Sequence, residues 1–266
     1  MKYNALPATT ENLRLCFSLM DLTSLRTEDT EASIAALVEK FNAFPAVFPD
    51  CPLPAGLCVF PNFVTTVKAQ LKVPVRIVAV SGSFPTAQTF DEVKALETKM
   101  AKEAGADEVD FVWDVNHFLA GDEKKAGESI GVHRRAVNPD ASAPRYPLKV
   151  ILETGMMNSP EDIFRAARIA IDGGADFIKT STGKIAVGAT PEAAEAMCRA
   201  IRESGEKVGF KAAGGISTVE DALLYAGIVR EILGSAWLNP ARMRLGVSRL
   251  ANKLLSALYG REIVYF

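Results

Sequence analysis

The sequence predicts a single α/β domain, a (β/α)8 barrel spanning residues 1–266, and three observations indicate this fold. The chain has 266 residues, a length at which such barrels form one domain. Eight short, nearly continuous apolar runs alternate with longer segments, as expected for parallel strands that helices cover on both faces. No linker, low-complexity tract or change in composition divides the chain.

The predicted strands are runs rich in Val, Ile, Leu and Phe. The first is LCFSLMD and the last is EILGSAW. The eight runs cover residues 15–21, 57–60, 76–82, 108–114, 148–154, 177–182, 208–214 and 231–237.

Residues that favour helix starts stand between these runs. Ser159 precedes a proline and lies three residues before Asp162, which combines a capping serine, a proline at the first helical position and a carboxylate in the first turn. Thr190 also precedes a proline, and residues 217–220 (Ser-Thr-Val-Glu) have the spacing of a capping box. The segments between the strands are therefore predicted to be helices.

The composition is that of an ordinary globular protein. Hydrophobic residues make up 48% of the chain and charged residues 23%, with a formal net charge of -2. This balance provides no electrostatic basis for binding nucleic acid or a membrane surface, and no apolar run has the length of a membrane span. Polar residues interrupt the first twenty positions, unlike in a signal peptide. The four cysteines form no CxxC pair, so we expect a reducing, cytoplasmic location.

Two segments repeat a Gly-Ala-Asp pattern that leads from a helix end into a strand. Residues 104–112 are AGADEVDFV and residues 173–181 are GGADFIKTS. The glycine suits the left-handed residue at a helix C-terminus. Superposing the segments places Asp110 at the position of Lys179, on the fourth and sixth predicted strands. Because alternate strands supply each layer of side chains inside such a barrel, we expect both residues to point inward.

A third charged residue, Lys211, lies near the end of the seventh predicted strand, beside the sixth. One isolated buried charge is costly, whereas two cations and a carboxylate can be accommodated together. An ion pair that only fixes packing is the alternative explanation. Lys149 is interpreted in that way, because it begins the fifth predicted strand and should lie at the stability end of the barrel.

Two lysines and an aspartate at the catalytic end of a barrel indicate Schiff-base chemistry. A lysine attacks a carbonyl carbon only as the neutral amine, the form of roughly one lysine in 2,500 at pH 7. Burial and a neighbouring ammonium group both increase that fraction. We therefore expect Lys179 to be the nucleophile, Lys211 the neighbouring cation and Asp110 the group that moves protons. The two histidines, His117 and His133, are expected at the surface.

Small residues after the last three predicted strands indicate a phosphate site. Small side chains let backbone N–H groups approach an anion, and the N-terminus of the helix that we expect after the eighth strand adds a favourable dipole. The last two loops of a barrel commonly provide such a site. The candidate phosphate-binding residues are Thr182, Gly183, Lys184, Gly214, Gly215, Gly246 and Ser248.

The chain resembles the deoxyribose-phosphate aldolase family over nearly its whole length. The resemblance rests on LMDLTSL (19–25), LCVFPNF (57–63), GADEVDFV (105–112), FIKTSTGK (177–184), GFKAAGG (209–215) and RLGVS (244–248).

This resemblance implies a class I aldolase that reversibly cleaves 2-deoxy-D-ribose 5-phosphate to D-glyceraldehyde 3-phosphate and acetaldehyde, with no metal or organic cofactor. It places the Schiff-base lysine at Lys179, the acid–base aspartate at Asp110 and the activating lysine at Lys211. Asp21 matches a further polar residue of that site, and Cys58 matches a cysteine of the substrate pocket.

Three positions differ from the family pattern or stand apart from it. Ala212 follows the second lysine, where the family often has proline, and Arg249 replaces a frequent second serine of the phosphate loop. A tyrosine in the tail assists proton transfer in some members. Here Tyr265 is penultimate and the tail is short, so we do not include it in the site.

Two other functions are compatible with these residues. One is another Schiff-base barrel, such as a transaldolase-like enzyme acting on a different phosphorylated carbonyl compound. The other is a catalytically silent barrel that binds sugar phosphates. The expected partners are a small phosphorylated sugar and an aldehyde, without nucleic acid or membrane, and a homodimer is the assembly considered.

Overall fold

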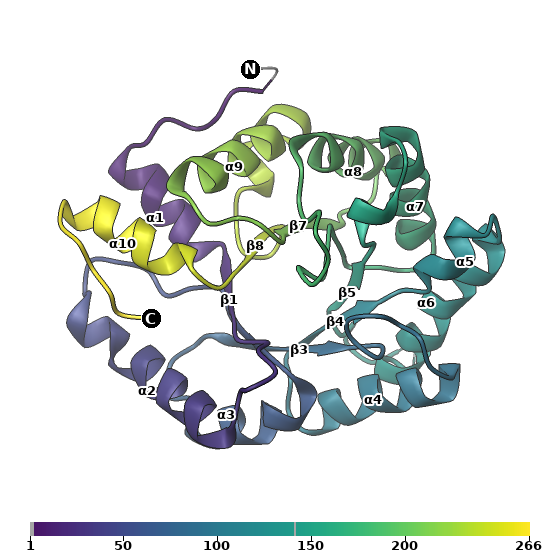
Figure 1. The fold of residues 1–266 in the computed structure, drawn as a ribbon, viewed down its shortest axis with the longest axis horizontal. Coiled ribbons are helices and arrows are strands. Elements are labelled where there is room, and N and C mark those ends of the chain that lie inside the picture. The colour runs from purple at the N-terminus through teal and green to yellow at the C-terminus, as the bar shows by residue number, and fades with distance from the viewer. Residues whose placement is uncertain (1–2, 141) are drawn as a thin grey trace.

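Eight parallel strands close into a barrel in the order of the sequence, and helices surround it (Figure 1). The computed structural model describes residues 3–140 and 142–266. The architecture confirms the predicted (β/α)8 barrel. The strands are β1 (Met20–Thr23), β2 (Gly56–Val59), β3 (Arg76–Ser81), β4 (Glu108–Val112), β5 (Leu148–Ile151), β6 (Phe177–Lys179), β7 (Gly209–Ala213) and β8 (Met243–Val247).

The outer layer consists of α-helices that connect or flank the strands. They are α1 (Thr10–Ser18), α2 (Glu31–Val47), α3 (Val64–Gln70), α4 (Asp91–Glu103), α5 (Val115–Leu119), α6 (Glu123–Val137), α7 (Pro160–Asp172), α8 (Pro191–Ser204), α9 (Val219–Leu233) and α10 (Leu250–Tyr259). Among the described residues, no helix is both long enough and apolar enough to cross a membrane.

The predicted helix starts are observed at or near their expected positions. The Ser159 hydroxyl accepts a hydrogen bond from the Asp162 amide at 3.1 Å, and Thr190 caps α8 in the same way. The third start lies one residue later than expected, because Thr218 rather than Ser217 forms the capping box of α9.

The first predicted strand is wrong over most of its length. Residues 15–18 belong to α1, which begins after Thr9, and only the residues from Met20 onward form β1. The buried positions Leu13, Cys16 and Phe17 are spaced by three and one residues, which places them on one face of a helix. A short apolar run cannot by itself distinguish a strand from a buried helix.

The eighth predicted strand, residues 231–237, is also wrong. Ile232 and Leu233 belong to the last turn of α9 and pack, partly buried, against the core; the helix is capped by Gly234 with a φ of 88°, and Ser235–Trp237 form a short 3-10 turn. The true strand, β8, contains Arg244, and this charge obscured it in the sequence. As a consequence Gly246 lies within β8, and Ser248 lies between β8 and α10 rather than in a helix.

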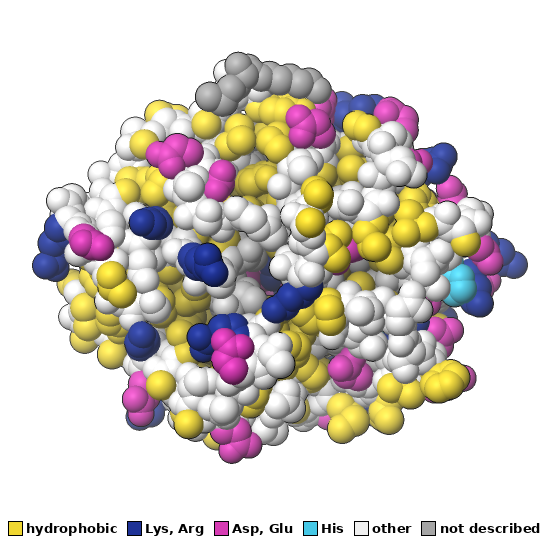
Figure 2. Space-filling model, in the orientation of Figure 1, with side chains coloured by type: hydrophobic (Ala, Val, Ile, Leu, Met, Phe, Trp, Pro, Cys, Tyr) yellow, Lys and Arg dark blue, Asp and Glu magenta, His cyan; other side chains and the backbone are white. Residues whose placement is uncertain are grey.

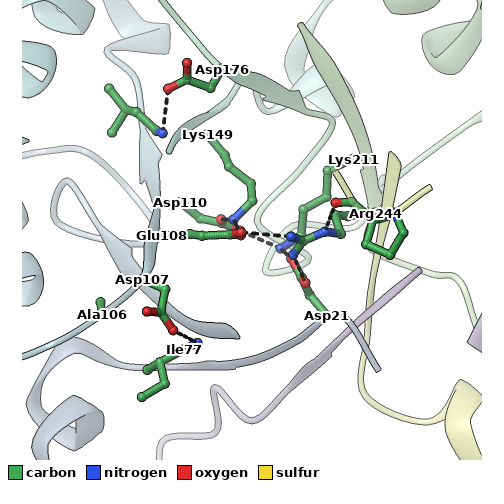
Figure 3. Close-up of polar contacts among 12 residues, drawn as sticks. Asp21, Ile77, Ala106, Asp107, Glu108, Asp110, Lys149, Asp176, Lys211 and Arg244 are labelled. Atoms are coloured by element: carbon green, nitrogen blue, oxygen red, sulfur yellow. Dashed lines mark hydrogen bonds and ion pairs between the residues drawn. The ribbon is translucent and has the colours of Figure 1, made fainter. Parts of the chain in front are cut away.

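The Gly-Ala-Asp repeat has a structural basis at the amino-terminal end of the barrel. Its glycines, Gly105 and Gly174, both have positive φ. The Asp107 carboxylate accepts a hydrogen bond from the Ile77 amide at 2.8 Å, and the Asp176 carboxylate accepts one from the Leu148 amide at 2.9 Å (Figure 3). Each aspartate thereby fixes its strand to the preceding one.

Side chains alternate between the barrel interior and the helices. On β4, Val109 and Phe111 belong to the large apolar core beneath the helices, whereas Glu108 and Asp110 point inward and meet other charged groups. The main hydrophobic core therefore lies between strands and helices, and the interior of the barrel holds charged side chains together with a small apolar cluster on β2 and β3.

The prediction that His133 lies at the surface is wrong. Its ring is 2% exposed, stacks on Phe111 with ring centroids 4.0 Å apart, and forms a hydrogen bond with Thr98. Burial lowers the pKa of His133 to about 3, so the ring is neutral at pH 7. This residue completes the packing between α4, α6 and β4.

The bond between Asp107 and Ile77 leads to a prediction about stability. Asp107→Ala should lower the free energy of unfolding by about 1–3 kcal/mol, because the Ile77 amide loses its acceptor. Urea denaturation measures this difference. Asp172→Ala, at the exposed end of α7, is the matched control and should change stability by less than about 0.5 kcal/mol. Equal effects of the two changes would contradict this account of the repeat.

Candidate active site

One carboxylate oxygen joins the three residues that the sequence singles out. The Oδ2 atom of Asp110 lies 2.9 Å from Nζ of Lys179 and 2.7 Å from Nζ of Lys211. These side chains extend from β4, β6 and β7, and none is more than 4% exposed. Lys179 and Lys211 are register partners on neighbouring strands, which places their ammonium groups side by side.

Further charged residues surround this group, and Figure 3 shows most of them. Lys211 also donates to Asp21, whose other oxygen lies 2.5 Å from Nη1 of Arg244. On the opposite side, Lys149 Nζ lies 2.8 Å from Oδ1 of Asp110 and 2.6 Å from Oε2 of Glu108. Nη2 of Arg244 lies 2.8 Å from Oε1 of Glu108.

The sequence predicted that Lys149 serves only to stabilise the lower end of the barrel, and the structure gives it a further contact. Its backbone does lie near the start of β5, but its long side chain extends inside the barrel toward Asp110 and Glu108 (Figure 3). There it bonds the second oxygen of Asp110. Lys149 is therefore in direct contact with the candidate acid–base residue.

The charges on Asp110 and Lys211 stabilise each other. Burial alone would raise the pKa of Asp110, but the ammonium groups of Lys149, Lys179 and Lys211 hold it well below its ordinary value. Burial alone would lower the pKa of Lys211, but Asp110 and Asp21 raise it above its ordinary value. Asp110 is therefore a carboxylate in the resting protein, and Lys211 is a permanent cation beside Lys179.

Glycines on both sides of Asp21 in the sheet leave room for Asp21 and for Lys211. Its register partners are Gly56 on β2 and Gly246 on β8. A Cβ atom on Gly56 would lie 2.6 Å from Oδ1 of Asp21, and one on Gly246 would lie 3.1 Å from Cε of Lys211. Gly246, predicted as a phosphate residue, thus also leaves room for the second lysine.

Cys58 lies at the side of the charged group rather than in the cavity wall. Its thiol is fully buried on β2 with Leu25, Val78 and Val80. Burial raises the pKa of Cys58, so the thiol is protonated at neutral pH.

A cavity of about 640 Å³ opens above the cluster, and Lys179 contributes to its lining. The walls come from α2 and from the loops that follow β1, β6, β7 and β8. Every residue predicted for phosphate binding lines this cavity, namely Thr182, Gly183, Lys184, Gly214, Gly215, Gly246 and Ser248.

The cavity is lined by cations. Figure 2 shows several Lys and Arg side chains around the hollow in the middle of the face that it presents. The cations of the lining are Arg26, Lys40, Lys179, Lys184 and Arg249, and within the described residues it includes no aspartate or glutamate. Arg249, which replaces a serine of the family pattern, therefore faces this cavity.

Glu153 is a residue of this region that the sequence analysis missed. It follows β5 in a left-handed conformation, with a φ of 55°, and is 3% exposed. Its carboxylate accepts hydrogen bonds from the amide and the hydroxyl of Thr182, at 3.1 and 2.5 Å. Lys184 donates to the carbonyl oxygen of Leu25. The loop after β6 is thus held at both ends, and a carboxylate near the end of the fifth predicted strand was the clue to Glu153.

Tyr265 does not contribute its hydroxyl to the cavity. That hydroxyl donates to the carbonyl oxygen of Lys40 at 2.7 Å, and the ring packs edge-on against Phe48. Phe266 instead lines the cavity. Ala212, the other departure from the family pattern, is buried in the core between β7 and the helices.

A lysine amine beside a carboxylate, at the inner end of a cavity on the carboxyl-terminal side of a (β/α)8 barrel, defines a class of enzymes that react with carbonyl compounds. The comparison with known families agrees with this class. The chain belongs to the DeoC/LacD family of aldolases, whose sequence model matches residues 17–249.

Known proteins resemble the chain over nearly its whole length. A deoxyribose-phosphate aldolase of Agrobacterium fabrum is 42% identical over 253 residues, which are 95% of this chain and 93% of that protein. A solved Toxoplasma gondii protein, provisionally assigned as a deoxyribose-phosphate aldolase, superposes with a TM-score of 0.80 at 22% identity, covering 94% of this chain and 95% of the other. The tetrameric deoxyribose-phosphate aldolase of Aeropyrum pernix superposes with a TM-score of 0.71 at 23% identity, covering 92% and 91%. At these identities the two structures support the fold.

The glycine beside Asp21 leads to a prediction about activity. Gly56→Ala should reduce kcat/KM by at least about tenfold, because the new methyl group would displace the Asp21 carboxylate from Lys211. Steady-state kinetics on the folded variant measure the effect. Gly131→Ala, on α6, where the added carbon meets only the flexible end of Arg135, is the control and should retain full activity. Full activity in Gly56→Ala would show that the position of Asp21 is unimportant.

Proposed function

We propose that this protein is a deoxyribose-phosphate aldolase that works through a Schiff base on Lys179. It reversibly cleaves 2-deoxy-D-ribose 5-phosphate to D-glyceraldehyde 3-phosphate and acetaldehyde. The observation that carries this proposal is the sharing of one Asp110 oxygen by Lys179 and Lys211 beneath a cation-lined cavity. The close resemblance to an aldolase of this name supports the choice of substrate.

The reaction begins with attack of the Lys179 amine on the C1 aldehyde of the open-chain sugar. The carbinolamine loses water to form an iminium ion, in which C1 can accept electrons from the adjacent bond. A base then removes the proton of the 3-hydroxyl group, the C2–C3 bond breaks, and its electron pair forms an enamine between C2 and C1. D-Glyceraldehyde 3-phosphate leaves, and protonation at C2 followed by hydrolysis releases acetaldehyde.

Asp110 and Lys211 have different roles in these steps. The Asp110 carboxylate is within hydrogen-bonding distance of Nζ of Lys179, so it can receive and return the protons that carbinolamine formation and dehydration require. Lys211 remains charged and disfavours a second ammonium group beside it. This assigns the nucleophile to Lys179, because Lys179 has one carboxylate partner whereas Lys211 has two.

The phosphate of the substrate is assigned to the outer part of the cavity, near the loops after β6, β7 and β8. Within the described residues, the amides of Gly183, Gly215 and Ser248 donate no hydrogen bond to another protein group, so they are available to an anion. Lys184 and Arg249 add positive charge to the same lining. Thr182, by contrast, is occupied by Glu153 and contributes by holding the loop in place.

Two further properties belong to this proposal. The four cysteines are free and buried, which supports a reducing, cytoplasmic location. A homodimer stays a prediction for this protein. The deoxyribose-phosphate aldolase of Aeropyrum pernix is a tetramer.

The nucleophile is tested by Lys179→Met. This variant should fold, because the apolar stem is kept and a buried charge is removed. It should lose borohydride trapping of acetaldehyde, as measured by intact-protein mass, and its cleavage of 2-deoxy-D-ribose 5-phosphate should fall by at least about a thousandfold. Lys124→Met, on the exposed surface of α6, should behave as the unmodified protein. Full turnover in Lys179→Met would rule out this mechanism.

The phosphate site is tested by Ser248→Ala, with both 2-deoxy-D-ribose 5-phosphate and unphosphorylated 2-deoxy-D-ribose as substrates. Loss of a hydroxyl that bonds a charged group should cost about 1.5–3 kcal/mol, or about ten- to a hundredfold in kcat/KM, for the phosphorylated sugar alone. Ser235→Ala, outside the cavity, serves as the control. Equal losses on both sugars would mean that Ser248 supports the barrel rather than the phosphate.

A further inference from the structure

Six charged side chains form a closed circuit of ion pairs inside the barrel, and Figure 3 shows all six. They come from β1, β4, β5, β7 and β8. We call this circuit the charged ring; in order its members are Asp110, Lys149, Glu108, Arg244, Asp21 and Lys211, and Lys211 returns to Asp110.

The charges of the charged ring alternate and cancel. Each of its three carboxylates contacts two cations of the ring, and each of its three cations contacts two carboxylates. Arg244 lies 2.5 Å from Asp21, and the contacts of Lys149 with Asp110 and of Arg244 with Glu108 are both 2.8 Å. No member is more than 5% exposed, so neighbouring protein charges rather than water must balance each one.

All six members are held in their charged forms. Burial acts against the charge of each, but the opposite charges in the ring prevail: the pKa values of Asp21, Glu108 and Asp110 are lowered, and those of Lys149, Lys211 and Arg244 are raised. At neutral pH the ring therefore has three negative and three positive charges.

Lys179 lies outside the charged ring and contacts it at one point. Its only ion-pair partner among the described residues is Asp110, through the oxygen that Lys211 also uses. Glu153 and Cys58 are the other titratable groups near it. The Glu153 carboxylate bonds Thr182 and forms no ion pair with Lys179, although the two groups attract each other at longer range, and the Cys58 thiol is neutral. A proton on Lys179 thus places a seventh charge beside the charged ring, whose own six charges already cancel.

We propose that Glu108 and Arg244 are positioning residues for the Schiff-base reaction that act through this charge balance. By completing the charged ring, they leave Lys179 as the one cation of this group that has no ring carboxylate to itself and shares its Asp110 oxygen with Lys211. Lys179 is then the group that gives up its proton and becomes the nucleophile. This inference rests on the proposed function, because it concerns the protonation of the proposed Schiff-base lysine.

Charge balance predicts opposite effects for the two positioning residues. Without Arg244, three carboxylates face Lys149, Lys211 and Lys179, so the protonated form of Lys179 becomes the balancing cation. Without the charge of Glu108, the cations exceed the carboxylates even before Lys179 is protonated, so its neutral form becomes more favourable. Removing both charges restores the original balance.

The test compares Arg244→Met, Glu108→Gln and the double variant with the unmodified protein. The measured quantity is the pH at which borohydride trapping of acetaldehyde on Lys179 is half-maximal, together with the acid limb of the pH–rate profile for 2-deoxy-D-ribose 5-phosphate. We expect Arg244→Met to move both to higher pH and Glu108→Gln to move both to lower pH, each on the order of one pH unit. The double variant should return toward the unmodified profile.

Two measurements keep this test decisive. Circular dichroism and thermal unfolding establish which variants fold, and Arg244→Lys, which keeps the charge but loses the fork of Arg244, should leave the acid limb in place even if its rate is lower. If Arg244→Met does not fold, Glu108→Gln alone decides the question by the direction of its shift. The inference is overturned if the acid limb of the pH–rate profile does not move, or if it moves in the same direction in both single variants. If the unmodified protein itself neither traps acetaldehyde nor cleaves the sugar phosphate, it is the proposed function that fails.

Discussion

The interior of this barrel depends on the requirement that every buried charge be matched by another one. Seven charged residues occupy much of a space that other barrels fill with apolar layers, and none of these residues is more than 5% exposed. Removing one partner from such a set leaves an uncompensated charge, which costs far more than the pair contributes. Asp110 is central because it contacts three cations, and its two oxygens connect the base of the barrel to the cavity.

The same requirement explains features of the backbone that have no chemical role of their own. Asp21 can meet Lys211 because Gly56 on β2 leaves room for its carboxylate and Gly246 on β8 leaves room for the lysine. The repeated aspartates at the amino-terminal end set the register of β4 and β6, and three residues further along each strand stand Asp110 and Lys179. The aspartates that hold the strands in register therefore also place the amine of Lys179 against the carboxylate of Asp110.

Much of this arrangement could be predicted from the sequence, and the omissions have physical causes. The Gly-Ala-Asp repeat brought Asp110 and Lys179 together because equal spacing from equivalent helix ends gives equivalent positions in a barrel. Arg244 was missed because a charge interrupts the apolar run of β8, and the strand was placed at 231–237, over the end of α9, instead of at Met243–Val247. Lys149 was misjudged because strand position locates a Cα atom, whereas its Nζ lies several bonds further into the barrel.

The cation-lined mouth of the cavity separates two electrostatic environments within one protein. Arg26, Lys40 and Arg249 are exposed to solvent, so their attraction for an anion extends over about one Debye length, or about 8 Å at physiological ionic strength. Dissolved salt therefore weakens the capture of a phosphorylated molecule from solution. The ions inside the barrel are shielded from that salt by protein. Ionic strength should consequently govern how often substrate arrives and leave the bond-breaking steps almost untouched.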